Sequence, residues 1–187
     1  KNGSPGRLIT FDGSASGVCS EVAFPPADVH PSGGTTGVNA IDATYIKIRG
    51  FTVYNSDDTE WGNGIRVMCD TRNGPCKEVY IEDNHVTLWG RKDTTPGSTT
   101  YTSYGIVIQG NFDGVYADGN TVIGKNMWSY NGLKAKITSA PGDDTYWGGP
   151  LTNVYLTNNV VKDWGHGHIG VDGIKPNCGL IDNVHIY

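Results

Sequence analysis

The stretch V-Y-I-E-D-N-H-V (79–86) returns along the chain with the same pattern. Its copies are I-K-I-R-G-F-T-V (46–53), V-Y-A-D-G-N-T-V (115–122) and V-Y-L-T-N-N-V-V (154–161), and V-H-I-Y (184–187) matches its beginning. The copies start 33, 36, 39 and 30 residues apart, which is the spacing of a coiled solenoid whose turns carry loops of different length. The repeat therefore predicts the architecture before any single residue is considered.

Within each copy, apolar and polar residues alternate as in a strand with one buried face. In the copy quoted first, Val79, Ile81 and Val86 are expected to point inward, and Asp83-Asn84 to form a tight bend. The corresponding bends are Gly50-Phe51, Gly119-Asn120 and Asn158-Asn159. We expect two ladders between turns: an amide ladder of Asn84, Asn120 and Asn159, and an outward stack of Tyr80, Tyr116 and Tyr155.

A second strand precedes each copy and begins with glycine: G-I-R-V-M at Gly64, G-I-V-I-Q at Gly105, G-L-K-A-K at Gly132 and G-I-K-P at Gly173. Its inward residues would be Ile65, Ile106, Leu133 and Ile174. Three short strands per turn, with like strands stacked in parallel, predict an all-β fold, a right-handed parallel β-helix. We expect one domain over 1–187, with irregular first turns over 1–43 and regular turns with long loops over 44–187. Leu8, Ile9 and Phe11 would lie in an opening strand, and 25–37 would be a long loop.

These residues resemble the pectate-lyase-like right-handed β-helix superfamily, in which the phrase "nv.i.nN.i" marks two strands of each turn. The opening N-G-S-P-G-R-L-I-T-F (2–11) is similar to the "sGtpG.pItf" start of several polysaccharide lyases of that group. The resemblance covers nearly the whole chain and implies the fold. Lyases, hydrolases, epimerases, adhesins and phage tailspikes share this coil, so the resemblance alone does not choose an activity.

Composition narrows the environment and the partners. The 187 residues carry a formal charge of −5, and no apolar run approaches the roughly 20 residues that cross a bilayer, so we expect neither a nucleic-acid partner nor a membrane partner. Cys69 and Cys76 enclose six residues and can close a local disulfide, with two free thiols as the other interpretation. A disulfide favours a secreted, extracellular protein. Cys19 and Cys178 lie too far apart along the coil to pair with each other. We also expect that the sequence is a portion of a longer chain.

The candidate catalytic residues lie on the outward positions of the glycine-led strand. Alternation places Arg66, Val107, Lys134 and Lys175 in one column, beside Met68, Gln109, Lys136 and Asn177 in the next. The resulting basic strip suits an acidic polysaccharide, and the resemblance implies that this strand lines the substrate groove. We predict β-elimination with Lys134 as base, Lys175 and Arg66 as carboxylate clamps, and Lys136 and Gln109 as substrate contacts. A solvated strand face is the plainer interpretation.

Aromatic residues gather in the loops beside this strand, where flat rings can contact the CH-rich faces of sugars. The predicted substrate contacts among them are Trp61, Trp128, Tyr130 and Trp147. Trp89, Tyr101, Tyr104, Tyr146 and Trp164 belong to the same group, of which most members would pack beneath the loops.

Three alternatives remain open at this stage. Asp143-Asp144 with Gly165-His166-Gly167 resembles the acidic pair and the histidine turn of polygalacturonase-type hydrolases, in which Asp143, Asp144 and His166 would act. The acidic residues Asp57, Asp58 and Glu60 could bind Ca²⁺, which many pectate-lyase-like enzymes use, or could simply be solvated in a loop. A non-catalytic carbohydrate-binding or adhesive β-helix would need only the basic strip and the aromatic loops.

Overall fold

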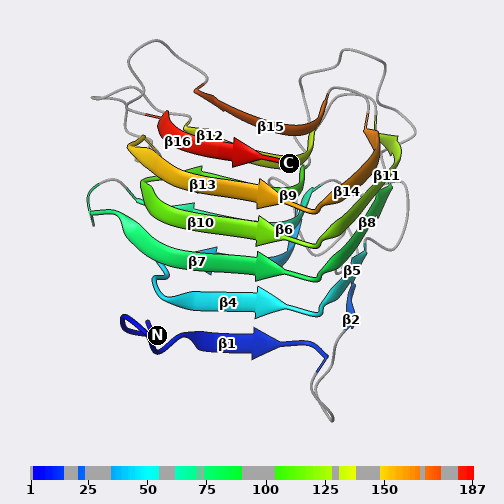
Figure 1. Ribbon diagram of the computed structural model, residues 1–187. Coiled ribbons are helices and arrows are strands. Elements are labelled where there is room, and N and C mark those ends of the chain that lie inside the picture. The colour runs from blue at the N-terminus through cyan, green and yellow to red at the C-terminus, as the bar shows by residue number, and fades with distance from the viewer. Residues whose placement is uncertain are drawn as a thin grey trace.

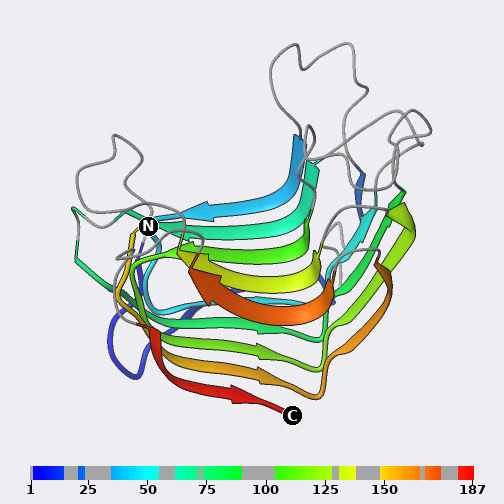
Figure 2. The ribbon, with the colours of Figure 1, turned by 90° about the horizontal axis from the view of Figure 1, so that it is seen from above.

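The strands form three parallel sheets that the chain visits in turn, once per coil. The computed structural model describes residues 2–14, 21–23, 35–54, 62–70, 72, 74–89, 104–127, 131–137, 148–164, 167–173 and 181–187. The predicted right-handed parallel β-helix is confirmed: like strands lie above one another along the coil axis (Figure 1), and the three sheets enclose one core when seen from above (Figure 2). No helix long and apolar enough to span a membrane occurs in the described ranges.

Each sheet collects one strand from every turn. The first sheet consists of β1 (Ile9–Asp12), β4 (Ile46–Arg49), β7 (Cys76–Glu82), β10 (Phe112–Asp118), β13 (Leu151–Thr157) and β16 (Ile181–Ile186). The second consists of β2 (Glu21–Ala23), β5 (Thr52–Tyr54), β8 (His85–Trp89), β11 (Thr121–Met127) and β14 (Val160–Trp164). The third consists of β3 (Thr35–Ile41), β6 (Gly62–Cys69), β9 (Tyr104–Gly110), β12 (Asn131–Ile137) and β15 (Gly167–Gly173).

The opening region is more regular than expected. Strands β1, β2 and β3 already occupy the three sheets, and β3 begins at Thr35, inside the segment expected to be a loop. The prediction of a loop over 25–37 is therefore wrong at its end, because Val38 and Ala40 supply the inward alternation that the Gly-rich sequence conceals. The opening strand is confirmed for Ile9 and Phe11, which align with Ile46 and Ile48 of the next turn, whereas Leu8 precedes the strand.

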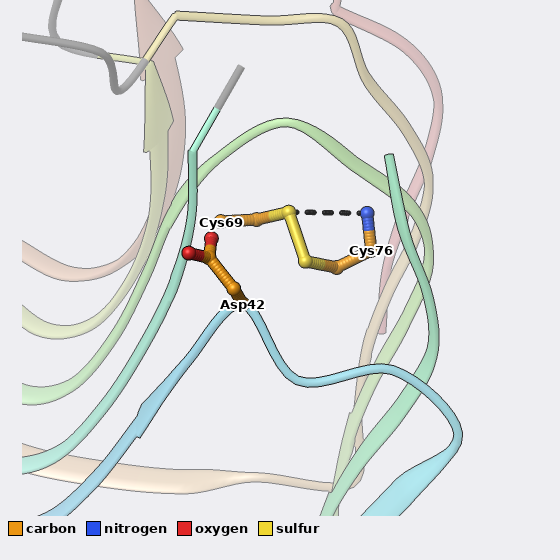
Figure 3. A group of neighbouring side chains, drawn as sticks. All are labelled: Asp42, Cys69 and Cys76. Carbon is orange, nitrogen blue, oxygen red and sulfur yellow. Dashed lines mark hydrogen bonds between the residues drawn. A yellow bond between two sulfur atoms is a disulfide. The ribbon is translucent and has the colours of Figure 1, made fainter. Parts of the chain in front are cut away.

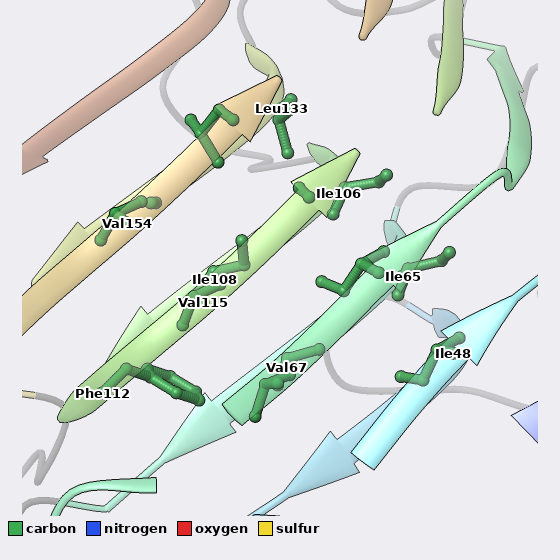
Figure 4. Packing of buried hydrophobic residues seen from close by; sticks show 14 of the residues in the cluster. Ile48, Ile65, Val67, Ile106, Ile108, Phe112, Val115, Leu133 and Val154 are labelled. Carbon is green, nitrogen blue, oxygen red and sulfur yellow. The ribbon is translucent and has the colours of Figure 1, made fainter. Parts of the chain in front are cut away.

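The core is a column of aliphatic side chains from all three sheets (Figure 4). Val79, Ile81 and Val86 are fully buried, as the repeat predicts, and their equivalents in the neighbouring turns align with them. Because each side chain packs on the equivalent residue of the turn above and below, the coil buries its apolar face without a second layer.

The bend between the first and second sheets is fixed by backbone geometry and by the predicted amide ladder. Gly50, Asp83, Gly119 and Asn158 have φ between 53° and 69°, in the left-handed region. In the next position, Asn84 Nδ2 donates to Asn120 Oδ1, and Asn120 Nδ2 donates to Asn159 Oδ1, both at 3.0 Å. These bonds hold successive turns in register, so that the bend recurs at the same position in each turn.

An aromatic stack runs along the outer face of the first sheet, as predicted. The ring centroids of Tyr80 and Tyr116 lie 4.6 Å apart, and those of Tyr116 and Tyr155 lie 5.0 Å apart. His185 extends the stack, with its ring 4.7 Å from that of Tyr155. Successive turns therefore superimpose closely enough to keep aromatic rings parallel through four coils.

Candidate functional site

The outward residues of the third sheet form the candidate site. Strand pairing aligns one residue from each turn in a column that we call the outer column: Asn39, Arg66, Val107, Lys134 and Gly170. A second outer column beside it contains Ile41, Met68, Gln109, Lys136 and Asp172. The residues between the two columns, such as Val67 and Ala135, are fully buried in the core, so the two columns face away from it.

The predicted register is wrong for the last copy of the glycine-led strand. Lys134 aligns with Gly170, not with Lys175, and Lys136 aligns with Asp172, not with Asn177. The inward positions belong to Ile169 and Val171 instead of Ile174. Gly173-Ile174 imitates the start of the strand, but the strand has already run from Gly167 to Gly173. The continuous basic strip is therefore interrupted, and Lys175 lies outside the described residues.

Arg66 lies near the start of the outer column. Its Nε donates a hydrogen bond to Asn39 Oδ1 at 3.1 Å, so the guanidinium is directed toward the preceding turn. Partial burial lowers the pKa of Arg66, but a guanidinium starting from so high a pKa stays charged at neutral pH. Arg66 is thus a fixed positive charge with an oriented fork of donors.

Lys134 lies two turns from Arg66, with Val107 between them in the outer column. The two Cα positions are therefore separated by about 10 Å, twice the usual distance between neighbouring strands. A Cβ added to Gly170 would lie 3.3 Å from Lys134 Nζ, so the ammonium lies beside a residue without a side chain. The amine therefore occupies the space that a side chain at position 170 would fill.

Lys136 has a more enclosed environment and a partner that the sequence did not indicate. It is only 7% exposed, its Nζ donates to the hydroxyl of Tyr104 at 2.9 Å, and the same Nζ lies 4.2 Å from the centre of the Tyr104 ring. Tyr104 starts β9 and Lys136 is near the end of β12, so both side chains extend along the outer face. Tyr104 was expected only as a loop aromatic, and no spacing signal links it to Lys136.

Gln109 is half-buried beside Lys136, as the second outer column requires. The structure thus brings Arg66, Lys134, Lys136 and Gln109 onto one face. The remaining predicted site residues lie outside the described ranges and stay predictions: Lys175, Trp61, Trp128, Tyr130, Trp147, Asp143, Asp144, His166, Asp57, Asp58 and Glu60. Cys19 and Cys178 lie outside them as well.

The predicted disulfide between Cys69 and Cys76 is present, and it lies beside a carboxylate (Figure 3). Asp42, Cys69 and Cys76 are the one group of three potential metal ligands within the described residues. Both sulfurs are consumed by the disulfide, and Ca²⁺ takes oxygen ligands, so this group does not fit a calcium ion. Asp42 instead accepts a hydrogen bond from the backbone N–H of Asp70 at 2.7 Å, which holds the turn in place.

Comparison of the chain with models of protein families, with curated proteins and with solved structures finds no match.

Proposed function

We propose that the chain binds an acidic, uronate-containing polysaccharide along the outer column and cleaves it by β-elimination. The observation that carries the proposal is the alignment of Arg66 and Lys134 in one column parallel to the coil axis. A polymer lying along that axis would meet the two cations and not the residue between them, because Val107 is only 1% exposed. The separation is comparable to the length of a disaccharide, so the two cations suit carboxylates that recur along the polymer.

The reaction assigns Lys134 the role of base. Its neutral amine would take the proton from the carbon next to the uronate carboxylate, a double bond would form to the neighbouring carbon, and the glycosidic oxygen on that carbon would leave and be protonated. Arg66 would hold the carboxylate of a neighbouring sugar, and Lys175 remains the candidate clamp for the reacting carboxylate.

A non-catalytic carbohydrate-binding β-helix is the second candidate. One observation favours it: Arg66 is held toward Asn39 and away from Lys134, so within the described residues it does not crowd the amine that has to be neutral. Binding of an acidic polymer needs only the two charges, whereas elimination also needs the neutral base.

Incubation with pectate, alginate and glycosaminoglycans separates these functions. We expect ultraviolet-absorbing unsaturated products from at least one polymer, and Lys134→Ala should reduce their rate at least about a hundredfold while retaining polymer binding. Lys162→Ala, an exposed lysine on β14 outside the columns, is the matched control and should keep full activity. Retained turnover in Lys134→Ala would place the base elsewhere.

The other outcomes are equally informative. Reducing ends without unsaturated products would contradict elimination and support the carboxylate alternative. Binding that Arg66→Ala and Lys134→Ala both weaken, without any cleavage, would support the second candidate. Absence of binding to every acidic polymer would overturn the proposal.

A further inference from the structure

A hollow of about 530 Å³ lies on the outer face of the first sheet, on a different side of the coil from the outer column. One side of it is the N-terminal turn, where Ser4 and Arg7 pair through backbone hydrogen bonds. The other side spans successive turns of the first sheet and includes Tyr80 of β7 and Tyr116 of β10. We call this space the tyrosine hollow.

A repeated backbone feature shapes its floor. In five turns a residue with a left-handed backbone comes immediately before the inward valine or isoleucine, with φ between 51° and 90°: Tyr45, Glu78, Gly114, Asn153 and Asn183. One of these residues, Gly114, lines the hollow and has no side chain to fill the space. A Cβ added there would lie 3.5 Å from Glu78 Oε1, so the Glu78 carboxylate lies directly over the glycine.

Two carboxylates in the hollow are each held by one oxygen. The hydroxyl of Tyr80 donates to Glu78 Oε2 at 2.5 Å, and Asn153 Nδ2 donates to Asp113 Oδ1 at 2.6 Å. Thr152 Oγ1 also donates to Asp113 Oδ1, at 3.4 Å. No described residue donates to Glu78 Oε1 or to Asp113 Oδ2. The hollow therefore presents two oriented acceptor oxygens whose position does not depend on a ligand.

The remaining lining adds apolar surface and one cation. Leu8 is 36% exposed and faces the hollow together with Pro5, and Lys77 contributes an ammonium group. The lining is thus mainly polar with an apolar patch at one side, which suits a sugar ring with many hydroxyl groups. Hydroxyl groups on adjacent sugar carbons can donate to two carboxylate oxygens while the CH face of the ring packs on leucine and proline.

The charges select among saccharides. Glu78 and Asp113 outweigh Lys77, so the hollow disfavours a uronate, which the outer column is suited to bind. A metal ion is not favoured, because within the described residues no third histidine, cysteine or carboxylate joins these two. We propose that the tyrosine hollow is a second carbohydrate site, which binds a short neutral saccharide independently of the acidic polymer.

Titration with neutral oligosaccharides tests this directly. Isothermal titration calorimetry with gluco-, xylo-, manno- and galacto-oligosaccharides should detect binding of at least one series to the wild-type chain. Glu78→Gln and Asp113→Asn should each weaken that binding at least about tenfold, because a charged acceptor is lost. Leu8→Ala, which removes only an apolar contact from a half-exposed side chain, should weaken it less and provides a variant that leaves both carboxylates in place.

Two controls make the result specific. Glu82 lies in the same strand as Glu78, pairs with Lys47 and does not line the hollow. Glu82→Gln should therefore leave saccharide binding unchanged. Lys134→Ala should also leave it unchanged, which separates this site from the proposed elimination. Failure of every neutral series to bind, or competition by oligouronides for the same site, would overturn the inference even if the acidic polymer is cleaved.

Discussion

At the scale of single residues, the glycine near the start of β6, β9 and β12 is required by a valine on the second sheet. A Cβ on Gly105 would lie 2.1 Å from Cγ1 of Val122 and 2.6 Å from the carbonyl oxygen of Gly132. Gly64 and Gly132 show the same conflict, with Val86 and Val161 respectively. Glycine at this position therefore lets an inward valine fill the corner of the coil.

We expect Gly105→Ala to lower the free energy of unfolding by about 3 kcal/mol, because backbone and a buried side chain would both have to move. Gly170→Ala, in the same sheet, meets only the flexible end of Lys134 and should change stability by less than about 0.5 kcal/mol. Urea unfolding followed by circular dichroism would compare the two variants. Equal free energies of unfolding for the two variants would show that Val122 and the neighbouring backbone can move to accommodate the added methyl group.

Three features of single residues could not be predicted from the sequence. The repeat identifies these glycines as strand starts, but it does not identify the valine that packs against each of them. Val122 and Gly105 lie on different strands and meet only in the folded coil. The pairing of Lys136 with Tyr104 was missed for the same reason. The assignment of Lys175 to the outer column failed because Gly173-Ile174 matches the glycine-led pattern better than Gly167-His168-Ile169, which is the segment that pairs with β12.

At the scale of elements, the bend between β10 and β11 depends on Asn120, which is fully buried. Its Nδ2 donates to the carbonyl oxygen of Ile81 at 2.8 Å, and its Oδ1 accepts from the backbone N–H of Asn84 at 3.0 Å. These bonds come in addition to those within the amide ladder, so the side chain connects three turns. The ladder was predictable from the sequence because its members recur at the same place in every copy.

Asn120→Ala should destabilise the protein by at least about 3 kcal/mol, because several buried polar groups lose their partner and each costs about 1–3 kcal/mol. The control is Asn158→Gly, which keeps a residue that tolerates the positive φ and removes one exposed hydrogen bond to Asp118. It should cost less than about 1 kcal/mol. A small effect of Asn120→Ala in a thermal melt would mean that water replaces the ladder.

At the scale of the whole molecule, the aromatic stack connects the turns on one side and makes the free energy of unfolding decrease at alkaline pH. Burial, and then the hydrogen bond to Glu78, raises the pKa of Tyr80 above its ordinary value of 10.0, and burial raises the pKa of Tyr116. The folded state thus holds these phenol protons more tightly than the unfolded chain does. The corresponding stability is complete below the unfolded pKa of about 10 and is lost as pH rises toward the folded pKa.

The melting temperature should therefore fall between about pH 9.5 and pH 12, in parallel with the tyrosinate absorbance of the stacked rings. Tyr80→Phe removes one of the titrating groups and should make this fall shallower, although its melting temperature at neutral pH is expected to be lower because the bond to Glu78 is lost. Tyr54→Phe, an exposed tyrosine outside the stack, should keep the wild-type slope. An unchanged slope in Tyr80→Phe would show that the stack does not couple proton release to unfolding of the coil.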